Sequence, residues 1–535
     1  MGFYQDHRAG SARWAQLPDV EAAGLCRGRG FHLGFFEGRA LASDDDGPVF
    51  IAAGSGAGKL TSCVGWHAIN DPGRNVFVDI KGEITVISIH NQVRMGKAAY
   101  VLNPHRMHGL PSHVCNVLAH LRPDSITLRI DIKLIAEFLI PSKSGGDGKF
   151  FEDQARAILE AFILYDVLAR GRTSLPRVKR MVDVIQGDVG QWQSLAEAMA
   201  AIGDEDIAAT IDALVTMQLD AGKTFASVMA EVRNGLAFLT DPAVRDALDE
   251  DADFTLEQAL CDPVKPANVY VVVSGEMMGV LATYVRAVLG ISLILKGRSP
   301  STPRVTFVVD EAPQLGKADF LLRSMTVGRG LGARTILIAQ DLGALRRVYG
   351  SEAEQTFLAS SPTQLWFGIR DRETASLLSR SSGVQSLYYD DRLQQQRAAH
   401  ARVQAIRSAM DGGGIGAALE ARHQARLEGH QMMVARPLIT EDEALRMPDD
   451  LSIVRVSGTG CPPILVSRPR YYEDRHNAGR YHPNPYVGSQ DTVQVRGLLG
   501  MKTVRVIREP VPDAFAHLPQ YCGGEWSYIE GYRPA

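Results

Sequence analysis

Short apolar runs alternate with stretches of helical periodicity from residue 49 onward in this 535-residue chain. The runs at 49–53, 76–79 and 98–102 consist mainly of Val, Ile, Phe, Leu and Ala. Each is too short for a buried helix and suits a strand that is covered on both faces. Because helix-compatible stretches separate these strands, the pattern predicts crossover connections, a mainly parallel sheet and an α/β fold.

The pattern changes between residues 150 and 219, where apolar residues recur at three- and four-residue spacing. The clearest example comprises Phe151, Ala155, Ile158, Leu159 and Phe162. This spacing predicts amphipathic helices at 151–169, 176–185, 192–202 and 207–219. Glycines at 145, 146 and 148 precede them and Gly222 follows. We therefore predict an all-helical domain inserted at residues 146–222.

Short apolar runs return after the helical stretch and predict further strands at 268–273, 305–309, 335–339 and 364–367. Helices are predicted between and after them at 279–296, 320–327 and 371–382. Two halves of one sheet therefore flank the insertion. Residues 1–48 are mixed and turn-rich, and residues 476–535, with many Tyr, Gly and Pro, are predicted to be irregular.

A glycine-rich loop follows the first predicted strand and precedes a helix. Its residues are Gly54, Ser55, Gly56, Ala57, Gly58 and Lys59. Such glycines let backbone N–H groups surround phosphate oxygens, the helix N-terminus adds partial positive charge, and Lys59 would reach the β- and γ-phosphates. A dinucleotide-binding loop would need a small residue in place of Lys59. An incidental glycine turn is the remaining alternative.

The loop departs from the usual P-loop pattern at both ends. Ala53 stands where the first glycine belongs, and Leu60 follows Lys59, so that Thr61 comes one place late. A one-residue shift turns a helical side chain by ~100°. Leu60 and Thr61 are thus included among the candidate nucleotide-binding residues, and whether Thr61 also reaches Mg²⁺ stays open.

Two carboxylates, Asp310 and Glu311, end the apolar run at 305–309. They are predicted to lie at the carboxyl edge of the sheet, where open α/β folds bind ligands. Asp310 would hold Mg²⁺, directly or through water, and Glu311 would orient and deprotonate an attacking water. Alone, the pair could be a solvated strand end. Together with the glycine loop it predicts a P-loop NTPase.

These features divide the chain into predicted parts. They are an N-terminal segment without a transmembrane helix (1–48), the first part of a nucleotide-binding domain (49–145), the helical insertion (146–222), the second part of the nucleotide-binding domain (223–383), an Arg- and Gln-rich helical or loop segment (384–430), the end of the nucleotide-binding domain (431–475) and the tail (476–535).

Composition narrows the possible partners and location. The net charge of −4 excludes a protein coated in basic surface, so any nucleic-acid contact must be confined to a channel or patch. The six cysteines show no C-x-x-C spacing, which is typical of a reducing compartment without a zinc ribbon or disulfide framework. The apolar run at 278–295 carries Arg286 and Gly290 and is predicted to be a buried amphipathic helix. We expect a cytoplasmic protein.

The segment at 390–430 carries arginines that could line a nucleic-acid path. They are Arg392, Arg397, Arg402, Arg407, Arg422 and Arg426. A solvated helical pair or a mobile loop is the alternative for this segment.

Several motifs outside the phosphate loop match one family. The most specific are the runs from Val78 to Glu83 and from Asp310 to Gly316, and further matches stand at 328–332, 339–342, 349–350 and 437–440. Over residues 12–474 the chain resembles the type IV secretion system coupling proteins, the TraG/TraD-type conjugative DNA transfer ATPases.

The resemblance implies a RecA-like domain that binds ATP and Mg²⁺ and carries an all-helical domain near the cytoplasmic mouth. It also implies a homo-hexameric ring that hands relaxase-bound single-stranded DNA, or effector proteins, to the channel subunits. By position, residues Gly54 to Lys59 would bind the phosphates. Asp310 would hold the metal and Glu311 would orient the water, and Gln340 would sense the γ-phosphate. Many members begin with membrane-spanning helices, which this chain lacks. We therefore expect peripheral attachment at the cytoplasmic face of the bacterial inner membrane.

Two arginines, Arg329 and Arg370, stand near the predicted sheet edge. Either could cross a subunit boundary and stabilise transition-state charge, an effect of ~10³–10⁵ in rate in other NTPases. A surface ion pair is the alternative for each.

The sequence leaves three functions open. The first is an ATP-hydrolysing coupling motor. The second is a non-hydrolysing adaptor that recruits cargo to a secretion system, which the irregular phosphate loop and the acidic charge balance favour. The third is a DNA-pumping ATPase of chromosome segregation, which would not explain the match at residues 81–83.

Overall fold

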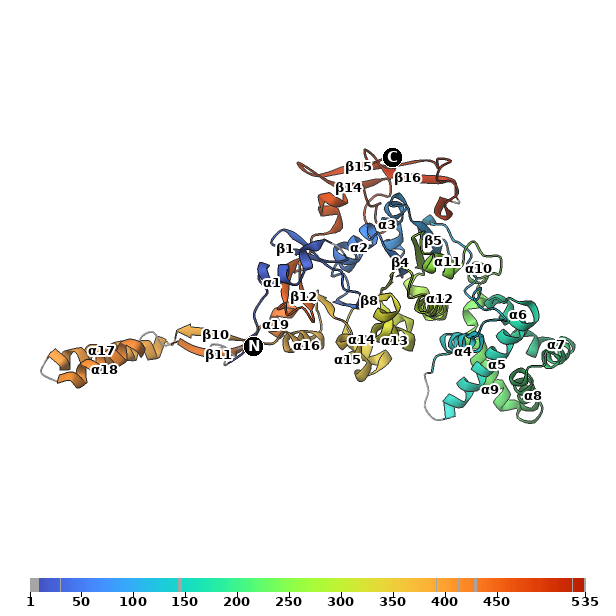
Figure 1. Ribbon diagram of the computed structural model, residues 1–535, viewed down its shortest axis with the longest axis horizontal. Coiled ribbons are helices and arrows are strands. Elements are labelled where there is room, and N and C mark those ends of the chain that lie inside the picture. The colour runs from blue at the N-terminus through green and yellow to red at the C-terminus, as the bar shows by residue number, and fades with distance from the viewer. Residues whose placement is uncertain are drawn as a thin grey trace.

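The computed structural model describes residues 9–28, 30–142, 147–390, 392–410, 414–427, 431–521 and 523–533. At its centre is an eleven-stranded sheet in the order β2-β1-β13-β12-β9-β3-β8-β7-β4-β6-β5. Helices cover both faces, with α2 and α3 on one and α12 to α16 on the other (Figure 1). Their bounds are α2 Gly65–Asn70, α3 Glu83–Arg94, α12 Met278–Arg298, α13 Asp319–Val327, α14 Leu342–Tyr349, α15 Ser351–Ala359 and α16 Arg372–Ser382.

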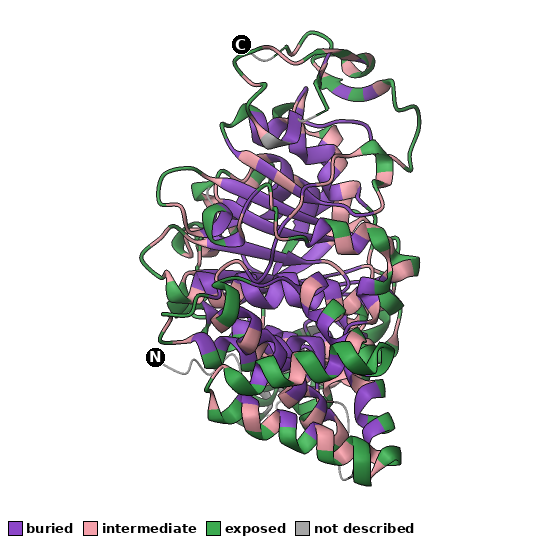
Figure 2. Cartoon of the chain, turned by 90° about the vertical axis from the view of Figure 1, so that its right-hand side faces the viewer, coloured by how far each residue is buried: buried purple, intermediate pink, exposed green. Residues whose placement is uncertain are grey.

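Adjacent parallel strands form the larger part of this sheet. They are β9 (Thr363–Phe367), β3 (Val49–Ala53), β8 (Ala333–Ala339), β7 (Val305–Val309), β4 (Arg74–Asp79), β6 (Ala267–Val272) and β5 (Ala98–Leu102). Alternate side chains enter opposite cores: Phe50 packs on one face and Ile51 on the other. Figure 2 shows these strands buried between helices whose outer surfaces are exposed. The predicted α/β fold with a mainly parallel sheet is confirmed.

Antiparallel strands extend the sheet beyond β9. They are β12 (Leu451–Val456), β13 (Ile464–Ser467), β1 (Phe31–Phe36) and β2 (Arg39–Ser43). The short helices α1 (Leu17–Ala22) and α19 (Glu441–Leu445) flank this region. The N-terminal segment, which was predicted only as turn-rich, therefore completes one edge of the sheet.

A helical lobe lies between β5 and β6 in the chain and beside the sheet in Figure 1. Its helices are α4 (Leu128–Leu139), α5 (Asp147–Arg170), α6 (Leu175–Gly187), α7 (Val189–Ala201), α8 (Glu205–Asp220), α9 (Gly222–Gly235), α10 (Pro242–Ala247) and α11 (Leu256–Cys261). The predicted helices correspond to α5 through α8. Both α4 and α9 also contact α5, so helical packing continues past residues 146 and 222. Those domain limits stay a prediction, and Gly145 and Gly146 lie outside the described residues.

One helical stretch within the described part of the chain, Gly275–Arg298, is long and apolar enough to cross a membrane. By length and composition alone it resembles the core helix of many globular proteins. About two thirds of its most apolar window, 67%, is buried inside the protein. The expectation that residues 278–295 form a buried helix is confirmed.

An arm, formed by the described residues between 384 and 437, projects from the body (Figure 1). The antiparallel strands β10 (Val384–Asp390) and β11 (Gln431–Pro437) form its base. Helices α17 (Arg392–Met410) and α18 (Gly414–Leu427) pack against each other beyond them. Of the two structural alternatives at residues 390–430, the structure adopts the helical pair. The nucleic-acid path along its arginines stays a prediction.

The prediction that residues 476–535 are irregular is wrong. Strands β14 (Thr492–Gly497), β15 (Gly500–Pro510) and β16 (Glu525–Ile529) form an antiparallel sheet. Val493, Val495 and Val506 pack with Ile69 and Ile87 from α2 and α3. The two-residue period of the valines carried this signal, but the surrounding Tyr, Gly and Pro residues obscured it.

Candidate active site

The glycine loop connects β3 to the helix that follows it, at the carboxyl edge of the sheet. Gly56 and Gly58 have φ angles of 73° and 78°, in the left-handed region that residues with a Cβ rarely adopt. At Gly54 an added Cβ would lie 2.2 Å from the carbonyl oxygen of Gly368, so only glycine fits against the end of β9. Within the described chain, the N–H groups of Gly56 and Gly58 have no acceptor. The loop therefore offers donors to an anion.

The extra residue of the loop is accommodated by a π-helix at Leu60–Val64. The Gly65 N–H donates to the carbonyl of Leu60, the five-residue spacing of a π-turn. Thr61 Oγ1 and Ser62 Oγ both donate to the carbonyl of Gly58, at 3.1 and 2.8 Å. The Thr61 hydroxyl therefore points back to the loop, and its lone pairs stay available to a cation.

The structure brings together the predicted lysine and acid pair. Lys59 Nζ donates to Glu311 Oε1 at 2.6 Å. It also lies 2.8 Å from Asp310 Oδ1, in an ionic contact whose alignment does not make a hydrogen bond. Glu311 has a φ of 55°, a strained value for a residue other than glycine, and such strain clusters at functional sites. Three chemically complementary side chains thus converge at one sheet edge.

Burial and charge act against each other at this centre. Burial alone would lower the pKa of Lys59, but the adjacent charges of Asp310 and Glu311 outweigh it and raise that pKa above its ordinary value. Lys59 therefore remains an ammonium group. The buried Asp310 Oδ1 has no hydrogen-bond donor, which leaves a carboxylate oxygen suited to a hard cation such as Mg²⁺.

A further acid, Asp79, ends β4 next to β7. Its Oδ2 accepts from the N–H and the hydroxyl of Thr85, both at 2.8 Å. Burial raises the pKa of Asp79 to about 6, because it outweighs these hydrogen bonds, and the charge of Asp310 adds to the rise. Sequence reasoning placed Asp79 in a family motif but assigned it no part in the site.

Gln340 and Arg370 follow the two strands that flank β3. Gln340 directly follows β8, the strand between β3 and β7, and so lies between the glycine loop and the acid pair. Arg370 follows β9, and its Cγ is 3.6 Å from the position of a Cβ added to Gly54. Within the described residues Arg370 has no ion pair. It therefore lies over the phosphate loop of its own chain.

Arg329 does not join this group. It lies in a short 3-10 helix, Gly328–Leu331, which precedes β8, and its Nη2 is 3.4 Å from Oδ2 of Asp45, which precedes β3. Both positions are at the amino edge of the sheet, opposite the glycine loop. A role for Arg329 in the site of another subunit stays a prediction.

Arg468 is a component that sequence reasoning missed. It follows β13 and is 4% exposed. Its Nη1 donates to Ser62 Oγ at 2.6 Å and its Nη2 to the carbonyl of Ala57 at 3.3 Å. No motif marks this arginine, which reaches the loop from more than 400 positions away in sequence.

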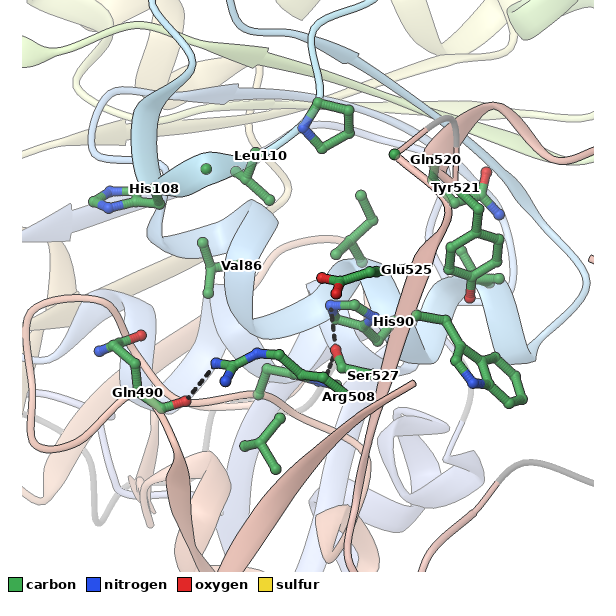
Figure 3. A pocket seen from close by; sticks show the side chains of 18 of the residues that line it. Val86, His90, His108, Leu110, Gln490, Arg508, Gln520, Tyr521, Glu525 and Ser527 are labelled. Atoms are coloured by element: carbon green, nitrogen blue, oxygen red, sulfur yellow. Dashed lines mark hydrogen bonds between the residues drawn. The ribbon is translucent and has the colours of Figure 1, made fainter. Parts of the chain in front are cut away.

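A separate cavity of about 770 Å³ lies between α3, residues 106–112 and the C-terminal sheet (Figure 3). Ser527 on β16 lies within hydrogen-bond distance of His90 on α3, at 3.4 Å, and Arg508 donates to the carbonyl of Gln490 at 3.2 Å. None of the predicted site residues lines this cavity. This cavity is therefore distinct from the site at the carboxyl edge of the large sheet.

The model of the type IV secretory system conjugative DNA transfer family matches residues 9–403 and 423–499. Conjugal transfer protein TraG of Escherichia coli is 24% identical over 517 residues, covering 87% of this chain and 76% of that protein. Protein VirD4 of Rhizobium rhizogenes is 23% identical over 485 residues, covering 87% of this chain and 66% of that protein.

Solved structures of a plasmid coupling protein, TrwB, have a similar fold. The complex of TrwB with ADP and Mg²⁺ aligns with a TM-score of 0.61 and 16% identity, over 88% of this chain and 95% of that one. The complex of TrwB with the non-hydrolysable ATP analogue ADPNP aligns with a TM-score of 0.60 and 17% identity, over the same shares.

Proposed function

The chain belongs to the type IV secretory system conjugative DNA transfer family and is a coupling protein of the TraG/TraD type, and from this premise we propose that it hydrolyses ATP to deliver cargo to a secretion channel. The proposed cargo is a relaxase–single-stranded DNA complex or effector proteins. The observation that carries the proposal is the convergence of Lys59, Asp310 and Glu311 beside the glycine loop.

The residues of the site divide the chemistry among them. The loop N–H groups and Lys59 would bind phosphate oxygens, and Asp310, with the Thr61 hydroxyl, would hold Mg²⁺. Bound Mg²⁺ would neutralise charge on the phosphates. Glu311 would orient a water for in-line attack and accept its proton. Gln340 lies between the loop and the acids, where it can contact the terminal phosphate.

Lys59 would exchange partners when the nucleotide binds. In this structure two carboxylates hold its ammonium group. Phosphate oxygens compete for the same cation, so that binding would release Glu311 to act as the base. Arg370 lies over the loop in the same chain and would add charge to the phosphates. The related protein TrwB has been solved with ADP and Mg²⁺, which supports ATP and Mg²⁺ as the cofactors here.

The proposed assembly is a homo-hexameric ring at the cytoplasmic face of the inner membrane. In such a ring Arg329, at the amino edge of the sheet, would reach the site of a neighbouring subunit. Single-stranded DNA would follow basic side chains by their charge, with a strongly salt-dependent affinity. The helical lobe lies beside the sheet and the arm projects from the body (Figure 1), and both would offer surfaces for cargo and channel subunits.

A non-hydrolysing adaptor is the second candidate. The departure of the phosphate loop from the usual pattern favours it, because Leu60 stands where a hydroxyl-bearing residue normally follows the lysine. Steady-state ATP hydrolysis by the purified chain, with and without single-stranded DNA, separates the two functions. We expect hydrolysis that rises with DNA and disappears in Lys59→Ala. Assembled rings that bind cargo but show no hydrolysis would support the adaptor and overturn the motor.

A further inference from the structure

We infer that Arg468 is a positioning residue that fixes the phosphate loop in its binding conformation. This inference rests on the proposed nucleotide site and names a determinant of affinity in it. Arg468 follows β13, an antiparallel strand near the edge of the sheet, and its guanidinium reaches the back of the loop.

The guanidinium contacts three segments at once. Nη1 donates to Ser62 Oγ at 2.6 Å, Nη2 to the carbonyls of Ala57, at 3.3 Å, and Asp449, and Nε to the carbonyl of Leu451 at 3.1 Å. Its carbon Cζ lies 3.6 Å from the centroid of the Phe367 ring, in a cation–π contact. These contacts fix a rigid fork between β12, the end of β9 and the loop.

The hydrogen bond from Arg468 to the carbonyl of Ala57 fixes the orientation of the peptide unit between Ala57 and Gly58. The carbonyl of Ala57 and the N–H of Gly58 belong to the same trans peptide unit, so they point in opposite directions. Because Arg468 holds the carbonyl on the back of the loop, the Gly58 N–H faces the front, where it has no acceptor within the described residues. A charged donor on the carbonyl also polarises the peptide and strengthens its N–H as a donor.

The bond to Ser62 controls the turn that follows the loop. Ser62 Oγ donates to the carbonyl of Gly58 at 2.8 Å and accepts from Arg468 at 2.6 Å. Arg468 and Ser62 thus hold both ends of Gly58. Arg468 thus contacts the loop at Ala57 and the π-helix that follows it at Ser62.

The test is equilibrium binding of Mg–ADP and steady-state hydrolysis of Mg–ATP by the full chain. Arg468→Gln is expected to weaken ADP binding and raise KM about tenfold, with kcat changed less than threefold, because the loop holds phosphates equally before and during reaction. Arg468→Lys keeps the charge but loses the fork, and a fivefold weakening is expected. The matched control is Arg455→Gln, which removes a half-buried arginine of β12 that donates to Gln364.

A double-mutant cycle with Ser62→Ala separates positioning from folding. Ser62→Ala removes the shared hydrogen bond and leaves Arg468 in place, so it tests the inference even if Arg468→Gln is unstable. We expect Ser62→Ala to weaken ADP binding threefold. In the double variant, ADP binding should be weakened by less than the product of the two single effects. The inference would be overturned if Arg468→Gln bound ADP as tightly as Arg455→Gln and wild type do. It would also be overturned if Arg468→Lys bound ADP as tightly as wild type, or if the effects of Arg468→Gln and Ser62→Ala on binding were independent. Absence of nucleotide binding by the wild type would instead overturn the proposed function.

Discussion

Charged side chains are paired differently at the two edges of the large sheet. At the amino edge, Arg304 pairs with Asp44 and Asp46, and Arg329 pairs with Asp45. At the carboxyl edge, Lys59 forms ion pairs with two acids, and Arg370 has no ion pair within the described residues. Charges at the amino edge are therefore balanced inside the chain, whereas those at the carboxyl edge are arranged for a ligand that brings anionic oxygens and a cation.

The largest effect is expected for Arg329, an amino-edge residue that would act at the carboxyl-edge site of a neighbouring subunit. If Arg329 acts on the site of a neighbouring subunit, Arg329→Ala lowers the kcat of DNA-stimulated hydrolysis by ~10³-fold or more, because transition-state charge loses its partner. Arg304→Ala, which removes another amino-edge arginine, is the control and should leave kcat within twofold.

Mixing variants tests whether Arg329 acts across a boundary. Arg329→Ala mixed with Glu311→Gln would recover part of the hydrolysis, because some boundaries then combine an intact Arg329 with an intact Glu311. Unchanged kcat in Arg329→Ala, or no recovery in mixed rings, would confine Arg329 to its ion pair with Asp45.

The next effect concerns the base at the carboxyl edge. Glu311→Gln removes the proton acceptor but keeps a hydrogen-bonding side chain, so kcat should fall ~10²–10⁴-fold while Mg–ATP affinity stays within threefold. Hydrolysis and equilibrium binding on the same samples measure both. A variant that hydrolyses ATP at the wild-type rate would show that Glu311 is not the base.

A smaller effect follows from Asp79. Its pKa is about 6 in the folded chain and 3.8 in the unfolded chain, so the folded state binds the proton more tightly and loses stability as pH rises from about 4 to 6. Two pKa units at about 1.4 kcal/mol each give a cost of about 3 kcal/mol at pH 7. Asp79→Asn keeps an acceptor for Thr85 and avoids that cost.

Thermal unfolding at pH 4, 5 and 7 measures the difference between Asp79→Asn and wild type. The variant should gain stability relative to wild type between pH 4 and 6 and keep the gain at pH 7. Asp44→Asn, an exposed acid of the amino edge, should change stability by less than about 0.5 kcal/mol at every pH. A gain for Asp79→Asn that does not depend on pH would show that burial does not shift this carboxyl.

The smallest effect is expected for Arg370 at the carboxyl edge. Arg370→Ala removes a cation from above the loop, so KM for ATP should rise about tenfold with kcat within threefold. Because Arg370 acts in its own chain, mixing Arg370→Ala with Glu311→Gln should restore nothing beyond the sum of the separate activities. Recovery in that mixture would place Arg370 across the boundary instead.

The sequence predicted the parallel strands well because each is buried on both faces and reads as one apolar run. It missed the strands at the two ends of the chain, such as β1 and β14, whose alternating or glycine-interrupted patterns are weaker. The central site followed from local motifs at Lys59 and Asp310. Arg468 could not be predicted, because its contacts join segments far apart in sequence.

The edges at which Arg329 and Arg370 lie could have been predicted from the sequence. Arg329 precedes a predicted strand and Arg370 follows one. In a parallel sheet these positions lie at opposite edges, so the pattern already separated them. Nearness to a strand end alone does not distinguish the two arginines, whereas their order relative to the strand does.

The most direct test of the carboxyl edge as the nucleotide site is a structure of the chain with Mg²⁺ and a non-hydrolysable ATP analogue. We expect phosphate density inside the loop at residues 54–59, Lys59 moved from Glu311 to the phosphates, and metal density beside Asp310. Nucleotide bound elsewhere, with Lys59 still paired to both carboxylates, would contradict it.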